Sequence, residues 1–389
     1  MAKFGVGQPV PRTEDPRFLK GQGNYVDDVN LPGQVHGYFL RSPHAHAHVQ
    51  IVGTNSAAAA PGVLLILTGS DVDAEGIAGI PSFIPPMAFG APPPKHSPLN
   101  PILIRDRARH VGDPIAFVVA ETLDKAKDAA ELIEVDYEIL PAITSTADAT
   151  APGAHLVWDE VTDNTWFTVE RGDQASTDSA FEGATHVIRR TLVNNRVSAN
   201  AMEPRATLID YAQATDHATV YTEVQAPHSQ RTHFSKVFGK PESHFRVISP
   251  DVGGGFGMKN NLFPEDAACY LAARRLCRPV KWVADRTESL MSDSHGRDTI
   301  TKAELALNAD GKFLGLRIAT NHAVGAYLGE AAPVPAGLGS TLYVGVYEFA
   351  AVHITVNTVF TNTTFIGPYR GAGRPEAVYV IERLVDAAA

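Results

Sequence analysis

Cysteine is scarce in this sequence, and its spacing excludes several kinds of site. Only Cys269 and Cys277 occur in 389 residues, and they do not form a C-x-x-C pair. The chain therefore provides no thiolate cage for zinc or for an iron–sulfur cluster, and it implies no disulfide framework. Both cysteines fall in or just after one predicted helix, so we expect buried free thiols in a reducing compartment.

Long apolar runs and an excess of positive charge are missing as well. The first residues are not followed by the apolar segment of a signal peptide, and no stretch approaches the length of a transmembrane helix. The 33 Lys and Arg are outnumbered by 43 Asp and Glu, which leaves a net charge of −10. This balance argues against nucleic acid or an anionic membrane as the main partner. We expect a cytoplasmic protein with no membrane span.

Glycine, in contrast, is concentrated at 253–257, where four glycines surround a phenylalanine. A predicted strand at 244–249 precedes this stretch, and a predicted helix at 264–276 follows it. Such a loop can take positive φ angles and present backbone N–H groups to an anion or a metal-bound oxygen. Its spacing fits neither the dinucleotide fingerprint nor the phosphate loop, because Met258 occupies a required glycine position and Asn260 follows Lys259. From these residues alone, a ligand loop and a plain strand–helix connection both remain open.

A second glycine-rich segment occupies 366–377, with the sequence IGPYRGAGRPEA. Together with TEVQAPH at 222–228, RSPHAHA at 41–47 and HVGDPIAFVVA at 110–120, the two glycine segments resemble the molybdenum-binding subunit of the xanthine oxidase family. That family includes aldehyde oxidoreductases and the large subunit of carbon monoxide dehydrogenase. The resemblance runs in order over nearly the whole chain, so it is far more specific than any one motif.

The resemblance implies an α+β fold, in which an α/β hammerhead domain is followed by the first part of the mixed α+β molybdopterin-binding domain. We assign residues 1–20 to an N-terminal arm, 21–141 to the hammerhead domain, 142–154 to a linker and 155–389 to the N-terminal part of the molybdopterin-binding domain. The clearest local unit supports the first assignment: a strand at 115–120, a helix at 121–133 with one apolar face, and a strand at 134–140.

The remaining elements follow from alternation and from turn residues. Strands are predicted at 35–40, 46–52, 62–69, 167–171, 186–192, 207–211, 219–224, 303–307 and 313–318, and helices at 229–238, 264–276 and 375–389. The proline-rich stretch 79–101 predicts a long surface loop. His44, His46 and His48 would share one face of a strand, where a structural role is favoured over metal binding.

The end of the chain predicts an incomplete subunit. In the helix predicted at 375–389, Val378, Ile381, Val385 and Ala388 continue one apolar face, and the sequence stops without a helix stop signal. Members of the resembled family are considerably longer. We therefore interpret the chain as the N-terminal half of such a subunit, either a natural split product or a truncation, and expect this apolar face to pack against the missing half.

The resemblance also implies which residues lie near the metal. The molybdenum ion would be held through a pterin dithiolene, so no side chain of this chain is expected to ligate it. Gln225 would donate its side-chain amide to an oxo ligand, and Phe256 would donate its backbone N–H, with Gly255 and Gly257 allowing the approach. Arg370 would hold the cofactor or a nearby anionic oxygen. From the residues alone, a solvated glutamine and a surface arginine are the alternatives.

Departures from the family pattern reduce the number of substrate classes that the resemblance implies. Carbon monoxide dehydrogenases place a copper-binding cysteine directly after the arginine, where this chain has Gly371 followed by Ala372, so oxidation of CO at copper is not expected. Purine oxidases place a glutamate where Asn260 stands, and they carry an arginine upstream of the second loop, whereas 318–369 contains no Lys or Arg. Asn260, Gly371 and Ala372 are therefore the substrate-pocket candidates, and an aldehyde or an N-heteroaromatic carbon is favoured as substrate.

The implied function is oxidative hydroxylation with water as the oxygen source. The implied cofactor is Mo-molybdopterin in its cytosine dinucleotide form, and electrons would pass to [2Fe–2S] and FAD in partner subunits. A further partner would carry the C-terminal half of the subunit with the general-base glutamate, so no catalytic residue is assigned here; Glu203, Glu265 and Glu376 match structural positions of the family. The alternatives are a cofactor-free fragment and a non-catalytic assembly module that retains the fold.

Overall fold

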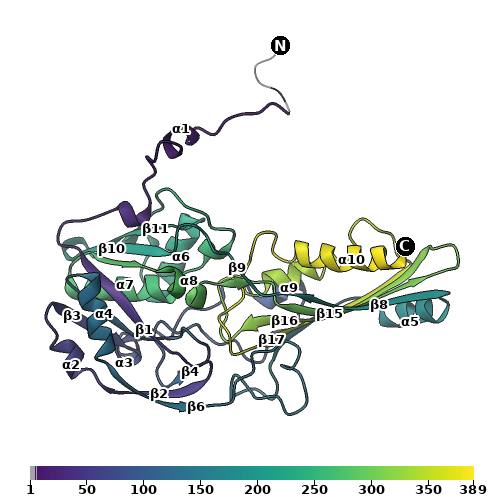
Figure 1. The fold of residues 1–389 in the computed structure, drawn as a ribbon, viewed down its shortest axis with the longest axis horizontal. Coiled ribbons are helices and arrows are strands. Elements are labelled where there is room, and N and C mark those ends of the chain that lie inside the picture. The colour runs from purple at the N-terminus through teal and green to yellow at the C-terminus, as the bar shows by residue number, and fades with distance from the viewer. Residues whose placement is uncertain (1–4, 6) are drawn as a thin grey trace.

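The structure is a computed structural model that describes residue 5 and residues 7–389. Part of the predicted arm at 1–20 therefore lies outside the described residues, and the rest contains the short helix α1 (Asp15–Phe18). Figure 1 shows two lobes with this arm extending from the first. In the part of the chain that is described, no helix is both long enough and apolar enough to cross a membrane.

The first lobe is built around a seven-stranded sheet. Its order is β12-β11-β10-β13-β1-β5-β3. The strands are β1 (Val35–Arg41), β3 (Val63–Thr68), β5 (Pro114–Ala120), β10 (Ala206–Ala212), β11 (His217–Thr222), β12 (Phe245–Ile248) and β13 (Val280–Val283). β1 pairs in parallel with β13, so strands from the predicted hammerhead domain and from the predicted second domain share one sheet.

Helices cover this sheet and bury it. They are α2 (Asn55–Ala58), α3 (Gly69–Ala74), α4 (Leu123–Glu131), α6 (Pro227–Phe238), α7 (Pro264–Leu276) and α8 (Arg286–Ser292), with short 3-10 turns η1 (Val26–Asp28), η3 (Gln213–Thr215), η4 (Glu242–His244) and η5 (Met258–Asn260). Every residue of β5 is buried, as are the first ten residues of α7. Burial of this apolar area is the main stabilising term of the lobe.

The predicted strand–helix–strand unit is present as β5, α4 and β6 (Glu134–Ile139). The hydroxyl of Thr122 caps α4 by accepting a hydrogen bond from the backbone of Lys125. β6 does not belong to the seven-stranded sheet. It pairs with β2 (Ala47–Gly53) in a three-stranded sheet whose third strand is β4 (Arg107–Ala108), in the order β4-β2-β6. The local pattern therefore predicted the elements, but not the sheets to which they belong.

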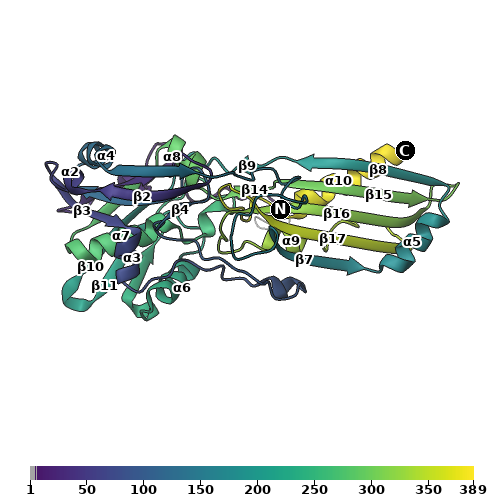
Figure 2. The same cartoon turned by 90° about the horizontal axis from the view of Figure 1, so that it is seen from below.

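The second lobe contains a five-stranded sheet in the order β7-β17-β16-β15-β8, whose strands run side by side along the long axis (Figure 2). The strands are β7 (Thr165–Gly172), β8 (His186–Asn194), β15 (Thr299–Leu307), β16 (Phe313–Gly325) and β17 (Ala351–Phe360), and the helices are α5 (Gln174–Glu182), α9 (Val334–Gly339) and α10 (Arg374–Ala388). The hairpin predicted at 308–311 joins β15 to β16. Two short strands, β9 (Val197–Ser198) and β14 (His295–Gly296), pair near the junction of the lobes.

The predicted apolar face of the last helix is correct only in part: Ile381 is buried and Val385 and Ala388 pack against the core, but Val378 does not. The buried side chains of α10 include Ala377, Val380, Ile381 and Leu384, and they pack against the core of the second lobe. Val378 is 49% exposed. α10 contacts β15 and β8, so the buried side of the helix packs within this chain.

Other expectations also need correction. His44 and His46 precede β2, so the three histidines do not share one strand; within the described residues, no group of three His, Cys, Asp or Glu side chains is arranged to hold a metal. Cys269 is buried as predicted, but Cys277 is exposed because the chain leaves α7 there in a left-handed conformation. The stretch 79–101 contains a 3-10 turn, η2 (Pro86–Phe89), and several buried residues, so it is not wholly a surface loop. The strands β13 and β17 and the helices α5, α8 and α9 were not predicted.

Candidate functional site

The glycine loop lies between β12 and η5 and has an unusual backbone. Gly254 has φ +101°, Phe256 +52° and Gly257 +92°, all in the left-handed region. A phenylalanine rarely adopts this conformation, so its surroundings must hold it there. At Gly257, a Cβ would lie 2.4 Å from the carbonyl oxygen of Pro368, which leaves no room for a side chain. The glycine therefore allows the second glycine-rich loop to approach the first.

The structure brings the three predicted segments into contact. The backbone N–H of Arg370 donates to the carbonyl of Phe256 at 2.9 Å. The backbone N–H of Gly257 donates to Gln225 Oε1 at 2.7 Å, and the Gln225 N–H donates to the carbonyl of Lys259 at 2.9 Å. Gln225, which follows β11, and the two glycine loops thus form one surface, although they are far apart in the sequence.

Gly255 has a steric role that differs from that of its neighbours. Its φ is not in the left-handed region, but a Cβ at this position would lie 2.6 Å from Gln225 Oε1 and 2.7 Å from Gln225 Cδ. The absence of a side chain lets the glutamine amide lie flat on the loop. Because Oε1 accepts from Gly257, the Nε2 amino group points its donors elsewhere.

Three hydrogen-bond donors of this surface have no partner among the described residues. The side chains of Gln225, Phe256 and Arg370 are exposed. Among the described residues, no protein acceptor meets Gln225 Nε2, the Phe256 N–H or the Arg370 guanidinium. The Arg370 Cζ lies 5.9 Å from the centroid of the Phe256 ring, which keeps the cation beside the loop. Donors arranged in this way suit a group rich in anionic or oxo oxygens.

The substrate-pocket candidates lie around the same surface. Gly371 has φ +101°, and a Cβ there would lie 2.6 Å from Pro375 Cδ. Ala372 is held at φ +45°, and its N–H donates to the carbonyl of Tyr369 at 2.8 Å. Asn260 is half-buried in η5. Its side chain makes no hydrogen bond to another described residue.

Sequence reasoning gave Glu203 a structural position but did not predict its ion pair with Lys259, which supports the first loop. Lys259 Nζ donates to Glu203 Oε2 at 2.8 Å and to the Glu203 carbonyl at 3.0 Å. Glu203 Oε2 also accepts from the backbone of Gly253 at 2.6 Å. Lys259 could have drawn attention as the cation two residues after the glycine loop, but nothing in the sequence indicates that it is buried.

The other two glutamates predicted as structural also form ion pairs. Glu376 pairs with Arg297 at 2.8 Å, and Arg297 donates further to the carbonyl of Arg370 at 2.9 Å, so this pair supports the second loop. Glu265 pairs with Arg205 and Arg41 at 2.8 and 2.7 Å. Burial opposes ionisation of Glu265, but the two guanidinium charges outweigh it and lower the pKa to about 2.

Two further carboxyl groups beneath the site are strongly perturbed. Burial raises the pKa of Glu223 to about 8, although its Oε2 accepts a hydrogen bond from Ala206 N at 2.8 Å. Burial likewise raises the pKa of Asp266 to about 6. Both line a small cavity of ≈ 10 Å³ together with Lys259, which is about the space that one water molecule needs. Burial therefore favours the protonated form of Glu223 near neutral pH.

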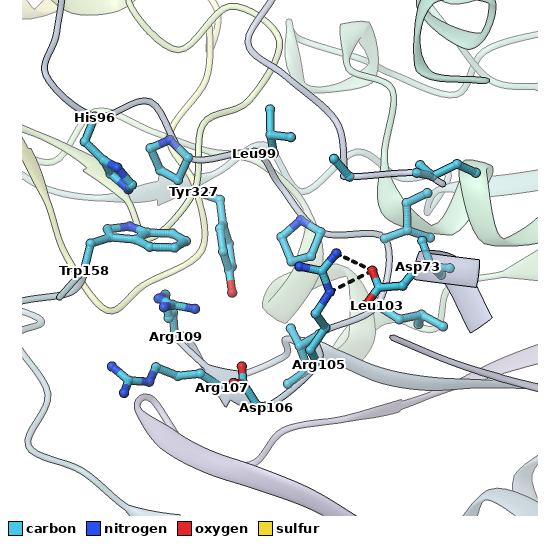
Figure 3. Close-up of a pocket in the computed structure, with 17 residues that line it drawn as sticks. Asp73, His96, Leu99, Leu103, Arg105, Asp106, Arg107, Arg109, Trp158 and Tyr327 are labelled. Carbon is cyan, nitrogen blue, oxygen red and sulfur yellow. Dashed lines mark hydrogen bonds and ion pairs between the residues drawn. The ribbon is translucent and has the colours of Figure 1, made fainter. Parts of the chain in front are cut away.

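A larger cavity lies elsewhere, between the strand β4 region and the second lobe. It has a volume of ≈ 220 Å³, and Figure 3 shows Arg105, Arg109, Trp158 and Tyr327 in its wall. Its polar groups are mostly engaged by the protein: Arg105 pairs with Asp73, the Arg109 guanidinium lies 3.7 Å from the Trp158 ring centroid, and the Tyr327 hydroxyl donates to a carboxylate. The cavity contains none of the predicted site residues.

Comparison with known families identifies two domains in the chain. The model of the molybdopterin cofactor-binding domain matches residues 157–389. The model of the aldehyde oxidase and xanthine dehydrogenase a/b hammerhead domain matches residues 20–141. Together the two models account for nearly all of the described chain.

Individual relatives cover the chain almost completely. The nicotine 6-hydroxylase large subunit of Paenarthrobacter nicotinovorans is 35% identical over 387 residues, which cover 98% of this chain and 46% of that protein. The carbon monoxide dehydrogenase large chain of Afipia carboxidovorans is 35% identical, with 98% and 48% covered. The chain thus spans about half the length of the curated relatives it matches.

Solved structures agree in fold. The crystal structure of quinoline 2-oxidoreductase from Pseudomonas putida 86 superposes with a TM-score of 0.91 at 35% identity, covering 99% of this chain and 48% of that one. Aldehyde oxidoreductase from Desulfovibrio gigas, at 21% identity, shares the fold with a TM-score of 0.84 and coverages of 97% and 41%. With a family model that matches most of its residues, the chain belongs to the molybdenum-binding large subunits of the xanthine oxidase, aldehyde oxidase and carbon monoxide dehydrogenase family.

Proposed function

We propose that this chain supplies part of the cofactor-binding surface of a molybdenum hydroxylase. The reaction would be oxidative hydroxylation of an N-heteroaromatic or aldehyde carbon, with water as the oxygen source. The observation that carries the proposal is the pair of hydrogen bonds that joins Gln225 to Gly257 and Arg370 to Phe256, which brings three exposed residues with free donors together. When bound, a molybdenum–pterin group would supply the oxygen transfer and the two-electron oxidation.

The residues of this chain would bind and orient that group. Gln225 Nε2 and the Phe256 N–H would donate to oxygen atoms, and Gln225 is held in place because its Oε1 already accepts from Gly257. Arg370 would offer its guanidinium fork to an anionic oxygen. Fixed donors of this kind stabilise charge without having to reorient during the reaction. None of these residues can act as the general base, which we assign to the part of the subunit that this sequence does not include.

Gly371 supports a copper-independent reaction. A copper site of the sulfur type needs a thiolate or thioether beside the arginine. Here Gly371 has a left-handed φ, and a Cβ would approach Pro375 Cδ to 2.6 Å, so a cysteine would strain this conformation. Asn260 and Ala372 present neutral surroundings, which suit an uncharged aromatic ring or an aldehyde. Names of relatives such as nicotine 6-hydroxylase and quinoline 2-oxidoreductase favour the N-heteroaromatic class.

The proposed assembly contains three kinds of partner. They are the remainder of the large subunit, a subunit that would hold [2Fe–2S] clusters and a subunit that would hold FAD. The two redox partners would remove electrons after each turnover. The cytosine dinucleotide form of the pterin and a cytoplasmic location belong to the same proposal.

Metal analysis of the protein purified from its native host tests this function. Molybdenum should be present in about equal amounts to the chain, with the partner chains identified by mass spectrometry in the same sample. Oxidation of quinoline and of benzaldehyde, followed with a dye as electron acceptor, would then distinguish the two substrate classes. A preparation that contains neither molybdenum nor partner chains would contradict the proposal and leave the cofactor-free fragment or the assembly module.

Site variants sharpen the test. Gln225→Glu keeps the acceptor for Gly257 but removes the amide donor, so molybdenum content or activity should fall while the fold is retained. Arg383→Ala changes an exposed arginine on α10 that pairs only with Asp386 and serves as the matched control. Equal loss in both variants would show that Gln225 has no specific role.

A further inference from the structure

We propose that the buried ion pair between Lys259 and Glu203 positions the glycine loop and Gln225, and thereby sets the geometry of the three donors that have no partner among the described residues. The effect of the ion pair on a bound cofactor rests on the proposed function. Its effect on the geometry of the loop concerns this chain alone. Neither residue belongs to the donor surface itself, so both are positioning residues and not catalytic ones.

Lys259 is a buried cation with one anionic partner. Only 1% of its side chain is exposed, and an ammonium group in such a place must be paired and hydrogen-bonded. Of the nearby acids, Glu223 favours its protonated form near neutral pH because it is buried, and Asp266 accepts from Phe263 N and from Gln230. Glu203 is therefore the charge that compensates Lys259.

The pair joins both ends of the loop to Gln225. Glu203 Oε2 accepts from Gly253 N, and Glu203 N donates to the Gly253 carbonyl at 3.2 Å, which anchors the start of the loop. Lys259 anchors its end, and the carbonyl of Lys259 accepts from Gln225 N. One carboxylate thus ties residues 253 and 259 together, with the strained part of the loop between them.

This tie explains how Phe256 keeps its left-handed backbone. The conformation is unfavourable for a residue with a Cβ, so it persists only where neighbouring contacts hold it. The position of the Phe256 N–H depends on the path of the loop between residues 253 and 259. The position of Gln225 Nε2 depends on it as well, because Gln225 is hydrogen-bonded to Gly257 and Lys259. Release of the Lys259 anchor should let the loop relax and should move both donors.

Hydrogen–deuterium exchange of the full chain tests the positioning role. In Lys259→Met, the hydrogen-bonded amides of Gly253, Gly257 and Met258 should exchange roughly tenfold to hundredfold faster, as expected from the loss of one charge-assisted hydrogen bond. Arg317→Met is the matched control, because it breaks ion pairs with Glu304 and Asp178 on the five-stranded sheet. Exchange at 252–258 should not change in this control.

Glu203→Gln provides a second variant if Lys259→Met does not fold. The amide oxygen can still accept from Gly253, but the charge is lost, so a smaller acceleration confined to the loop is expected. Loop exchange that matches the control in every folded variant would overturn the positioning role. So would an acceleration spread evenly over the whole chain, since that reports global destabilisation.

A separate measurement tests whether the ion pair affects a bound cofactor. In the complex from the native host, Glu203→Gln should alter the electron paramagnetic resonance signal of reduced molybdenum, because the donors have moved. A wild-type signal together with faster loop exchange would overturn that consequence. A wild-type chain without molybdenum would overturn the proposed function alone, because the exchange measurement still decides the role of the ion pair.

Discussion

Two glycines of the first loop are needed for different physical reasons, and this difference can be measured. Gly257 combines a left-handed φ with a backbone carbonyl at the position of a Cβ, so a substitution there must displace the second loop. Gly255 has an ordinary φ and faces the end of a flexible glutamine. A side chain at 255 can therefore be accommodated by moving Gln225, at little cost in stability.

Gly255→Ala should change the site more than the fold. The free energy of unfolding should stay within about 1 kcal/mol of the wild type, whereas molybdenum content should fall because Gln225 is displaced. Gly257→Ala should cost about 1–3 kcal/mol. Denaturant unfolding and metal analysis check both results. Gly311→Ala, which has a left-handed φ but open space around it, controls for backbone strain. A stability loss in Gly255→Ala as large as that in Gly257→Ala would contradict this distinction.

Glu223 should make stability fall as the pH rises. Its folded pKa of about 8 lies above the ordinary value, so its contribution is fully present below the unfolded pKa and is lost as the pH rises through about 8. The slope from this group is at most about 1.4 kcal/mol per pH unit. Glu223→Gln should flatten the dependence between pH 6 and 8.5 relative to the wild type, measured by urea unfolding across that range. Parallel curves for the two proteins would show that Glu223 is ionised in the fold.

At the scale of single elements, periodicity located the helices but not always their buried faces. α4 and α7 were predicted close to their observed bounds, because capping residues and apolar spacing are local signals. In α10, the predicted face included Val378, although the helix rests on β8 and β15 through Val380, Ile381 and Leu384. Several apolar stripes are available on this helix, and only the position of the sheet decides which of them is buried.

Leu384→Ala tests this placement of α10. Leu384 is fully buried, so its truncation should destabilise the fold by about 2–5 kcal/mol. Val378→Ala removes an exposed valine of the same helix and should change stability by less than about 1 kcal/mol. Denaturant unfolding of both variants decides between the two faces. A larger loss in Val378→Ala than in Leu384→Ala would show that Val378 is buried, as the sequence predicted.

At the scale of the whole molecule, a buried charge cluster joins the hammerhead strands to the second part of the chain. Arg41, in β1, pairs with Glu265 in α7 and with Glu288 in α8, both at 2.7 Å. Arg205 completes the cluster through Glu265 and Asp293. Each of these groups is desolvated, so every charge depends on its partners.

Arg41→Met should therefore be strongly destabilising. Removal of one partner leaves buried carboxylates uncompensated, and the expected loss is about 3–5 kcal/mol. Arg105→Met removes an exposed arginine that pairs with Asp73 and should cost no more than about 1 kcal/mol. Thermal and denaturant unfolding provide the comparison. Similar small losses in both variants would show that the buried cluster contributes no more than a surface pair.

The sequence by itself determined the local units and the residues of the candidate surface. Glycine, capping residues and alternation act over a few neighbours, so the glycine loop, the β5–α4–β6 unit and α7 could be predicted. The sequence alone also indicated the family, through motifs that occur in the right order. Whether Gln225, Phe256 and Arg370 bind the cofactor stays a prediction.

Only the tertiary structure decided which distant segments meet. The parallel pairing of β1 with β13 joins residues 35 and 280, and no local pattern encodes such a contact. Burial of Lys259 against Glu203, the protonation of Glu223 and the buried face of α10 likewise depend on what packs against them. Desolvation and charge compensation are properties of the assembled interior, and they arise only when segments far apart in the chain exclude water together.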